Sequence, residues 1–200
     1  PDPIEGWRIV RCEPNRGHIA GQNICFEQAR GEWVLFVAND VRLLPETLRI
    51  LWDNKDDISQ PFVWKTNREI DNCGMRWVWP GYGLNLTRPI CICHPIGFNG
   101  SCYLMQKTTW ESVGGFDEQL KTSHEDVEFS LRAHRMGFRI RNIPKTHVIH
   151  LSNATLRHQP SHNRAAFHRD RVYVIKKHYR GFPRFLRLAA VYLLDSIPRL

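Results

Sequence analysis

One stretch decides the fold of this 200-residue chain: Gly31-Glu32-Trp33-Val34-Leu35-Phe36-Val37-Ala38-Asn39-Asp40. Its apolar run has no polar alternation, which is typical of a strand buried on both faces of a parallel sheet. We expect one helix before it, from about His18 to Ala29, and another after it, from Pro45 to about Trp52. Strands and helices that alternate at this spacing indicate an α/β fold with a mainly parallel sheet flanked by helices.

The flanking segments extend this pattern in both directions. Trp7 to Cys12 alternates apolar and polar residues, which predicts a strand. We expect further strands at residues 58–64, 96–105, 138–143 and 147–150, and further helices at residues 108–113 and 125–136. Residues 66–95 are rich in Gly, Pro, Asn and Trp, which predicts loops or a hairpin insertion. The tail from about Ser161 is expected to be helical, with a break at Gly181-Phe182-Pro183.

The chain is basic, with a formal charge of +8, and the excess of Lys and Arg is greatest toward the C-terminus. Such a charge is common in soluble domains, and it also attracts anionic partners such as nucleotide phosphates or a membrane surface. The sequence contains no homeodomain, zinc-finger or RNA-recognition signature. We therefore expect no nucleic-acid partner.

Six cysteines are present, and the only cluster is Cys91-Ile92-Cys93-His94. A structural zinc site needs a second pair of ligands at a suitable spacing, which this cluster lacks. Reduced cysteines are therefore favoured over zinc. No signal peptide or membrane-spanning run is apparent, so we expect a cytoplasmic protein.

Asn39-Asp40 is the first candidate site, because ligands bind beyond the carboxyl ends of strands in an open α/β sheet. A carboxylate there can hold a divalent cation that bridges two phosphates. An Asp at such a position is more often a turn or capping residue. The local sequence leaves both readings open.

Ser123-His124-Glu125-Asp126, at an expected helix start, is the second candidate. The spacing of Ser123 and Asp126 is that of a capping box, and acids are favoured there by the helix dipole. A carboxylate fixed at a helix N-terminus also suits a general base. The third candidate, His150, is a structural residue unless Asp40 holds a metal, which its imidazole would then help to coordinate.

The order of these features resembles that of the family 2 glycosyltransferases of GT-A fold. The matching motifs are residues 15–23 (NRGHIAGQN), 31–40 (GEWVLFVAND), 114–118 (GGFDE) and 125–129 (EDVEF), with Arg132, Gly137 and His150. The resemblance covers roughly residues 7 to 150 and is greatest to rhamnosyl- and galactofuranosyl-type transferases. It implies a GT-A-like, Rossmann-like domain at residues 1–155, with a helical extension at residues 156–200.

The resemblance also implies roles for individual residues. Asp126 matches the family's general base, and Glu125 would contact or place the attacking hydroxyl. Asp40 and His150 match the ligands of Mn²⁺ or Mg²⁺, although Ala38 stands where the family's Asp-x-Asp motif has its first acid. The donor-binding positions are Asn15, Gly17, Asn23, Asn39, Asp40, Gly100 and Ser101.

An inverting glycosyltransferase is the function that follows from the resemblance. It would move a sugar from a nucleotide-diphosphate donor to a hydroxyl of a glycan or lipid-linked glycan. The alternative is a catalytically impaired relative that binds sugar or nucleotide. Ala38 favours this alternative, and so does the lack of a match to the family's first strand and helix, which predicts an N-terminally incomplete fold.

Residues 182–200 combine apolar side chains with Arg184, Arg187 and Arg199. This composition suits a helix that lies on an anionic membrane surface, near a lipid-linked acceptor. It equally suits an amphipathic helix packed on its own domain, which is the slightly favoured reading. On the first reading the protein contacts the inner face of the membrane peripherally.

Overall fold

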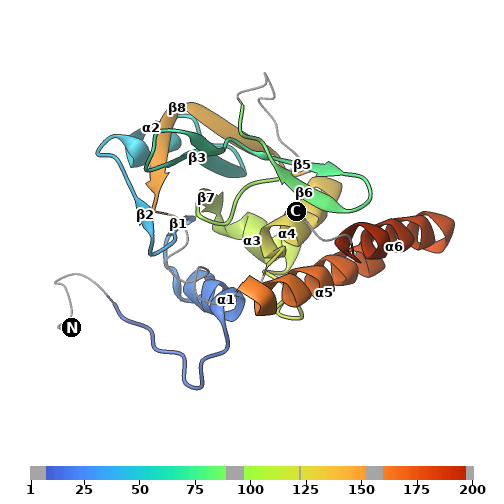
Figure 1. The fold of residues 1–200 in the computed structure, drawn as a ribbon. Coiled ribbons are helices and arrows are strands. Elements are labelled where there is room, and N and C mark those ends of the chain that lie inside the picture. Colours follow the sequence, from blue (N-terminus) through green and yellow to red (C-terminus); the bar gives the residue numbers. More distant parts are fainter. Residues whose placement is uncertain (1–7, 89–96, 122, 152–159, 197–200) are drawn as a thin grey trace.

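The computed structural model describes residues 8–88, 97–121, 123–151 and 160–196. A central sheet lies between helices (Figure 1). It has six strands in the order β1-β7-β3-β8-β2, with β4 paired to β3. The strands are β1 (Trp33–Val37), β2 (Val41–Arg42), β3 (Ile58–Lys65), β4 (Ile70–Asn72), β7 (Cys102–Gln106) and β8 (Ile140–His150).

The sheet is mixed, whereas the sequence predicted a mainly parallel one. β3 and β8 are parallel, but β7 runs antiparallel to both β1 and β3, and β2 runs antiparallel to β8. The start of β7 lies beside the end of β1, since the backbone N–H of Ala38 donates to the carbonyl of Ser101 over 2.9 Å. A chain that enters the sheet at that end can only run back along β1.

Helices cover both faces of the sheet because side chains alternate along its strands. Tyr103 and Met105 of β7 contribute to a large core with α1 (His18–Gln28), α3 (Lys107–Val113) and α4 (Glu125–Arg135). Leu104 faces the other way and packs with Leu51 of α2 (Thr47–Asp53). Each of these buried side chains contributes roughly 1.5–3 kcal/mol of hydrophobic stabilisation.

Two further units complete the fold: a hairpin of β5 (Met75–Val78) and β6 (Tyr82–Asn85), and the helices α5 (Pro160–His178) and α6 (Gly181–Ser196). α5 runs beside α1 and α4, and α6 turns back along it (Figure 1). Glu128 of α4 is fully buried and pairs with Arg132, Lys177 and His178, so this ionic cluster joins α4 to the end of α5.

Most predicted elements are confirmed to within a few residues, and the hairpin insertion is found within residues 66–95. The predicted strand at residues 7–12 is wrong for residues 8–12, which pair with no other strand in the described structure. The strands predicted at residues 138–143 and 147–150 form one strand, Ile140–His150, because a register shift opposite Pro61 and Phe62 accommodates Pro144. The tail breaks at Tyr179 and Arg180, since Pro183 lies in the first turn of α6, where no N–H is needed. The cluster at residues 91–94 lies outside the described residues.

Candidate active site

Asp40 and His150 come together at one edge of the sheet. The backbone pairs Val41 of β2 with His150 of β8, and the N–H of Leu151 donates to the carbonyl of Asp40 over 2.8 Å. This backbone pairing brings the two side chains together, and Nε2 of His150 lies 3.3 Å from Oδ2 of Asp40. The two residues that the sequence proposed as metal ligands are therefore neighbours.

Asp71 of β4 is a third member of this group, and the sequence analysis missed it. Its Oδ2 lies 3.1 Å from Nδ1 of His150, so the imidazole is held between two carboxylates. Asp71 belongs to a three-residue strand inside the segment that the sequence left irregular. No local pattern marks it, because its position depends on the pairing of β4 with β3.

The chemistry of Asp40 and His150 fits a divalent cation such as Mn²⁺, which accepts both carboxylate oxygen and imidazole nitrogen. A carboxylate on the second nitrogen of a histidine is also a common way of orienting a metal ligand. In the described parts of the chain, no group of three or more His, Cys, Asp or Glu side chains is arranged to hold a metal ion.

Glu125 and Asp126 form the first turn of α4, as predicted. The predicted capping box is absent: His124 is the N-cap residue, and it makes no side-chain capping bond. His124 has a φ of 68°, a left-handed conformation that is uncommon for a non-glycine residue and is found at functional sites. Ser123 bonds instead to the His124 ring, with Oγ 2.7 Å from Nδ1.

The Asp126 carboxylate is anchored by two backbone N–H groups. Gly100 donates to Oδ2 over 3.0 Å, and Val127 donates to Oδ1 over 2.7 Å. Burial and the adjacent charge of Glu125 nevertheless raise the pKa of Asp126 to about 7, and the two backbone bonds only partly oppose this. A carboxylate with such a pKa can accept a proton near neutral pH, as a general base must.

His18 of α1 adds a hydrogen-bonding partner to this pair, although the sequence gives no separate signal for it. Its Nε2 lies 3.2 Å from Oε1 of Glu125, and this hydrogen bond raises the pKa of His18. The segment at residues 15–23, which matches the donor side of the family's site, therefore contacts the first turn of α4.

The structure places the predicted donor residues in different settings. Asn15 accepts the N–H of Gly17 over 2.8 Å and shapes the turn before α1. Asn23 is buried, and its amide bonds to the backbone of Phe116 in both directions. Asn39 is exposed beside Asp40. Their contacts with a donor stay predictions.

Gly100 and Ser101 connect the two halves of the site. Ser101 bonds to the end of β1 through Ala38, while Gly100 bonds to Asp126. Asp40 lies close after β1, so the Asp40–His150 pair and the carboxylate of Asp126 lie at the same end of the sheet. This is the end at which the fold class binds its ligands.

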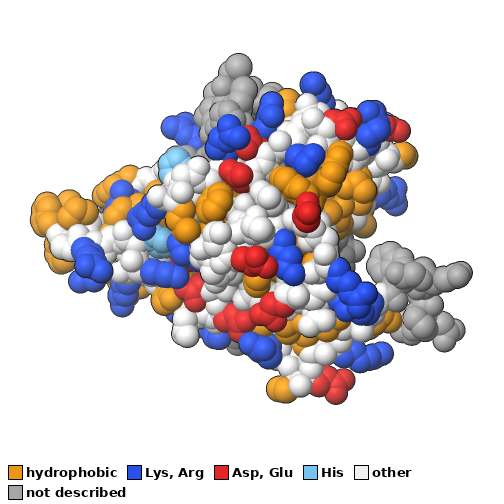
Figure 2. Space-filling model, turned by 180° about the vertical axis from the view of Figure 1, so that it is seen from behind, with side chains coloured by type: hydrophobic (Ala, Val, Ile, Leu, Met, Phe, Trp, Pro, Cys, Tyr) orange, Lys and Arg blue, Asp and Glu red, His pale blue; other side chains and the backbone are white. Residues whose placement is uncertain are grey.

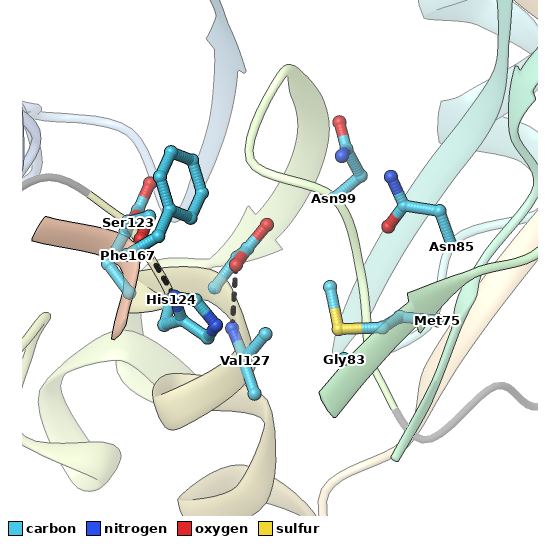
Figure 3. A pocket seen from close by; sticks show the side chains of 10 residues that line it. Met75, Gly83, Asn85, Asn99, Ser123, His124, Val127 and Phe167 are labelled. Carbon is cyan, nitrogen blue, oxygen red and sulfur yellow. Dashed lines mark hydrogen bonds between the residues drawn. The ribbon is translucent and has the colours of Figure 1, made fainter. Parts of the chain in front are cut away.

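A cavity of about 410 Å³ opens beside Asp126. Figure 3 shows Phe167, Ser123 and His124 on one side of it, and Asn99, Asn85 and Met75 on the other. The described lining residues are Met75, Gly83, Asn85, Asn99, Ser123, His124, Glu125, Asp126, Val127 and Phe167. The hairpin, α4 and α5 all contribute to its wall, and its volume is that of a small-ligand site.

α5 also holds the backbone of Lys121 and Ser123, just before α4. Asp170 is buried, and its Oδ2 accepts the backbone N–H groups of Ser123 over 3.1 Å and of Lys121 over 3.3 Å. A carboxylate that accepts two backbone N–H groups holds a loop firmly in place. The helical tail is thus in direct contact with the candidate active site.

Solved structures with a similar fold are glycosyltransferases. GalNAc-T7, in a structure with UDP, GalNAc and Mn²⁺, matches with a TM-score of 0.57 and 15% identity over 70% of this chain and 31% of that one. The mannosyltransferase PcManGT from Pyrobaculum calidifontis, in complex with GDP-Man and Mn²⁺, matches with a TM-score of 0.55 and 15% identity over 93% of this chain and 51% of that one. At this identity the likeness shows the fold alone, and it confirms the expected GT-A architecture.

Sequence relatives agree with the structural ones. The N-acetylglucosaminyl-diphospho-decaprenol L-rhamnosyltransferase of Mycobacterium tuberculosis is 29% identical over 91 residues, 45% of this chain and 30% of the relative. The O-antigen biosynthesis protein RfbC of Myxococcus xanthus is 32% identical over 62 residues, 31% of this chain and 5% of the relative. The chain therefore spans less than a third of the length of these relatives.

The sequence model of glycosyl transferase family 2 matches residues 3–113. This match covers more than half of the chain and includes the stretch from Trp33 to Asp40. It ends before α4 and β8, which carry Asp126 and His150. With the fold, the relatives and this match in agreement, the chain belongs to glycosyl transferase family 2.

Proposed function

We propose that this chain carries the catalytic site of an inverting glycosyltransferase, which moves a sugar from a nucleotide-diphosphate donor to a hydroxyl of a glycan or lipid-linked glycan. The observation that supports this most directly is the carboxylate of Asp126. It is fixed by Gly100 and Val127, its pKa is raised to about 7, and it lines a cavity large enough for a sugar.

In this proposal Asp126 accepts the proton of the acceptor hydroxyl as that oxygen attacks the anomeric carbon. The attack comes from the face opposite the leaving diphosphate, so one displacement inverts the anomeric centre. Glu125 keeps the pKa of Asp126 high enough for proton transfer at neutral pH. Asp40 and His150 would hold Mn²⁺ or Mg²⁺, which offsets the charge that develops on the diphosphate.

Ala38 favours one alternative, a relative that binds donor or sugar without turnover. It leaves Asp40 as the one acid of the Ala38-Asn39-Asp40 motif. The Asp71 carboxylate beside His150 supports the active reading, because it adds negative charge to the same edge of the sheet.

Titration with nucleotide sugars, with and without Mn²⁺, separates these functions when combined with an assay of donor hydrolysis. Metal-dependent binding with slow hydrolysis supports the enzyme, and binding without turnover supports the impaired relative. We expect Asp126→Asn to lower turnover by roughly 10² or more and to leave donor binding nearly unchanged. Near-normal turnover in this variant would exclude Asp126 as the base.

We also propose that α6 contacts an anionic membrane surface. None of the described helices has the length and apolar character needed to cross a bilayer. One stripe of α6 packs on α5 through Val191 and Leu188, whereas Phe182, Phe185 and Leu193 are 65–70% exposed. Hydrophobic side chains gather with Lys and Arg at the projecting end of the molecule (Figure 2), which is the end that α6 forms in Figure 1. This combination suits an interfacial helix.

A further inference from the structure

We propose that the cavity beside Asp126 binds one uncharged pyranose ring of the acceptor, with Phe167 of α5 as the platform for the ring's C–H face. Asn85 and Asn99, on the opposite wall, would bind its hydroxyl groups. This inference rests on the proposed function, and it names what the function leaves open: the chemical class of the acceptor group and the residues that select it.

Phe167 lies on the cavity wall next to the N-cap residue of α4. Its ring makes an edge contact with the His124 imidazole, with the centroids 5.9 Å apart, and it is half-buried on the cavity wall. Asp170, three residues further along α5, is tied to the backbone of Lys121 and Ser123. A half-buried aromatic ring on a cavity wall is a good surface for the apolar face of a sugar.

The wall opposite Phe167 is polar and comes from two other segments. Figure 3 shows Asn85 and Asn99 across the cavity from Phe167, and both line it. The orientation of Asn99 is set by Ser101, whose backbone N–H donates to its Oδ1 over 3.0 Å. Because Oδ1 of Asn99 already accepts from Ser101, this amide can offer its N–H donors to a ligand, whereas the Asn85 amide carries both donors and an acceptor. The two amides therefore suit hydroxyl groups, which also donate and accept.

The charge of the cavity determines which ligands fit. Its described lining includes two carboxylates, Glu125 and Asp126, and no Lys or Arg. Burial lowers the pKa of His124 to about 4, so this imidazole is neutral at pH 7. Among the described lining residues, a phosphate or a uronic acid would meet carboxylates and no Lys or Arg that could offset the cost of desolvating it. An uncharged ring is therefore favoured, and the diphosphates of donor and lipid must lie elsewhere.

The hairpin fixes the width of the cavity. A Cβ atom on Gly83 would lie 2.6 Å from Cγ2 of Val127 and 2.8 Å from Sδ of Met75. The backbone of β6 therefore lies directly against the residue that follows Asp126. With the hairpin so close to α4, the space between Asn85 and Phe167 is set by packing rather than by a mobile loop.

The test measures the binding of methyl glycosides to the full chain by saturation-transfer NMR. The probes are the methyl glycosides of glucose, N-acetylglucosamine and rhamnose, with methyl glucuronide as the anionic counterpart of the glucoside. We compare the wild type with Phe167→Ala, Phe167→Tyr and Asn85→Ala. Phe185→Ala is the matched control, because it removes an exposed phenyl group from the neighbouring helix and lines no part of the cavity.

We expect at least one neutral glycoside to bind, with an affinity roughly threefold to tenfold weaker in Phe167→Ala, as is typical for the loss of one aromatic contact. Phe167→Tyr and Phe185→Ala should bind as the wild type does, Asn85→Ala should weaken binding, and the glucuronide should bind less than the glucoside. Equal binding by Phe167→Ala and the wild type, a preference for the glucuronide, or binding of none of the neutral glycosides would overturn the inference.

These outcomes are separable from the failure of the proposed function, because glycoside binding needs neither donor nor turnover. If the wild type did not hydrolyse the donor but bound glycosides in a way that depends on Phe167, the proposed enzyme activity would be refuted and the proposed sugar site would stand. Hydrolysis with glycoside binding that is insensitive to Phe167 would refute the sugar site alone. Thermal melting of each variant identifies any that is misfolded, and Asn85→Ala, at an exposed position, supplies the test if Phe167→Ala is one of these.

Discussion

Asp40 and His150 are 110 positions apart in the sequence, and their side chains lie 3.3 Å apart in the fold. Backbone pairing between β2 and β8 brings them together, and Asp71 supports the imidazole from its other nitrogen. A pair built in this way has a fixed ring orientation before any ligand binds. This arrangement gives a specific expectation for metal affinity.

We predict that Asp71→Asn weakens Mn²⁺ binding by roughly 10–100-fold, the usual effect of removing a carboxylate that orients a ligating histidine. His150→Ala should weaken it at least as much. Free Mn²⁺ can be counted directly by electron paramagnetic resonance during a titration, independently of activity. Asp53→Asn, on the exposed side of α2, is the control and should bind as the wild type does. Unchanged affinity in Asp71→Asn would rule out the orienting role.

The pH dependence of turnover should follow Asp126. Because a general base acts in its ionised form and the pKa of Asp126 is about 7, kcat/KM should rise as the pH rises through about 7. Glu125→Gln removes the adjacent negative charge that raises this pKa, so the inflection should move to lower pH. Glu111→Gln, on the exposed surface of α3, should leave the profile in place. A shift to higher pH in Glu125→Gln would contradict the assignment.

Asp126 should also make the fold sensitive to pH. A carboxyl whose folded pKa is raised above its unfolded value of 3.8 contributes stability below that value, and this stability is lost as the pH rises through about 7. Asp126→Asn carries no charge at any pH, so at pH 8 it should be more stable than the wild type, by about 1 kcal/mol or roughly 2–4 °C in Tm. Calorimetry at pH 5 and pH 8 measures the Tm of both proteins. If Asp126→Asn raised the Tm more at pH 5 than at pH 8, the ionised carboxylate would not be the cause of the stability difference.

The effect of pH on stability has the opposite sign at Glu128. Burial alone would raise its pKa, but hydrogen bonds from His178 and Arg132 lower it to about 2. Its contribution to stability is therefore present above the unfolded value of 4.5 and is lost as the pH falls through about 2. Glu128→Gln should cost about 3 kcal/mol at pH 7, because it removes the buried carboxylate that pairs with Arg132, Lys177 and His178.

Urea denaturation at pH 7 and pH 3 tests this expectation for Glu128→Gln. The difference from the wild type should be smaller at pH 3, where the wild type has already lost part of the contribution. Glu27→Gln, on the exposed face of α1, should differ from the wild type by less than about 0.5 kcal/mol at either pH. A difference that grows toward pH 3 would contradict the role of the ionised carboxylate.

The exposed stripe of α6 predicts binding to vesicles. Phe185→Ser combined with Leu193→Ser should reduce co-sedimentation with phosphatidylglycerol vesicles by roughly tenfold or more, because each side chain would lose its burial in the interface. Leu48→Ser on α2, which is also exposed, should have no effect. Equal sedimentation of the double variant and the wild type would end the membrane proposal.

Much of the fold follows from local sequence, and the reason is visible in single elements. The run from Trp33 to Val37 and the turn at Asn39-Asp40 are found where they were predicted, because burial and turn chemistry act on neighbouring residues. The strand predicted at residues 7–12 is not found at residues 8–12, because an alternating sequence does not by itself provide a partner strand. The mixed strand directions of the sheet also lie beyond local signals, since β7 is placed by its contacts with β1.

The candidate site shows the same division. Asp126, Glu125, Asp40 and His150 belong to recognisable motifs, and the structure places them in two adjoining groups. Asp71, His18 and Phe167 could not be found in this way, because each acts through a neighbour that is distant in sequence: His150, Glu125 and the cavity wall. The capping box expected from Ser123 failed because this residue bonds to His124 and its N–H is held by Asp170.

The backbone bonds that join β2 to β8 have a consequence for how this site can evolve. They fix Asp40 and His150 without help from the hairpin of β5 and β6, which forms its own small sheet. If the hairpin selects the acceptor as proposed, changes in its sequence or length would alter the sugar that is accepted while the Asp40–His150 pair keeps its geometry. The choice of acceptor and the activation of the donor would then be inherited as separate traits.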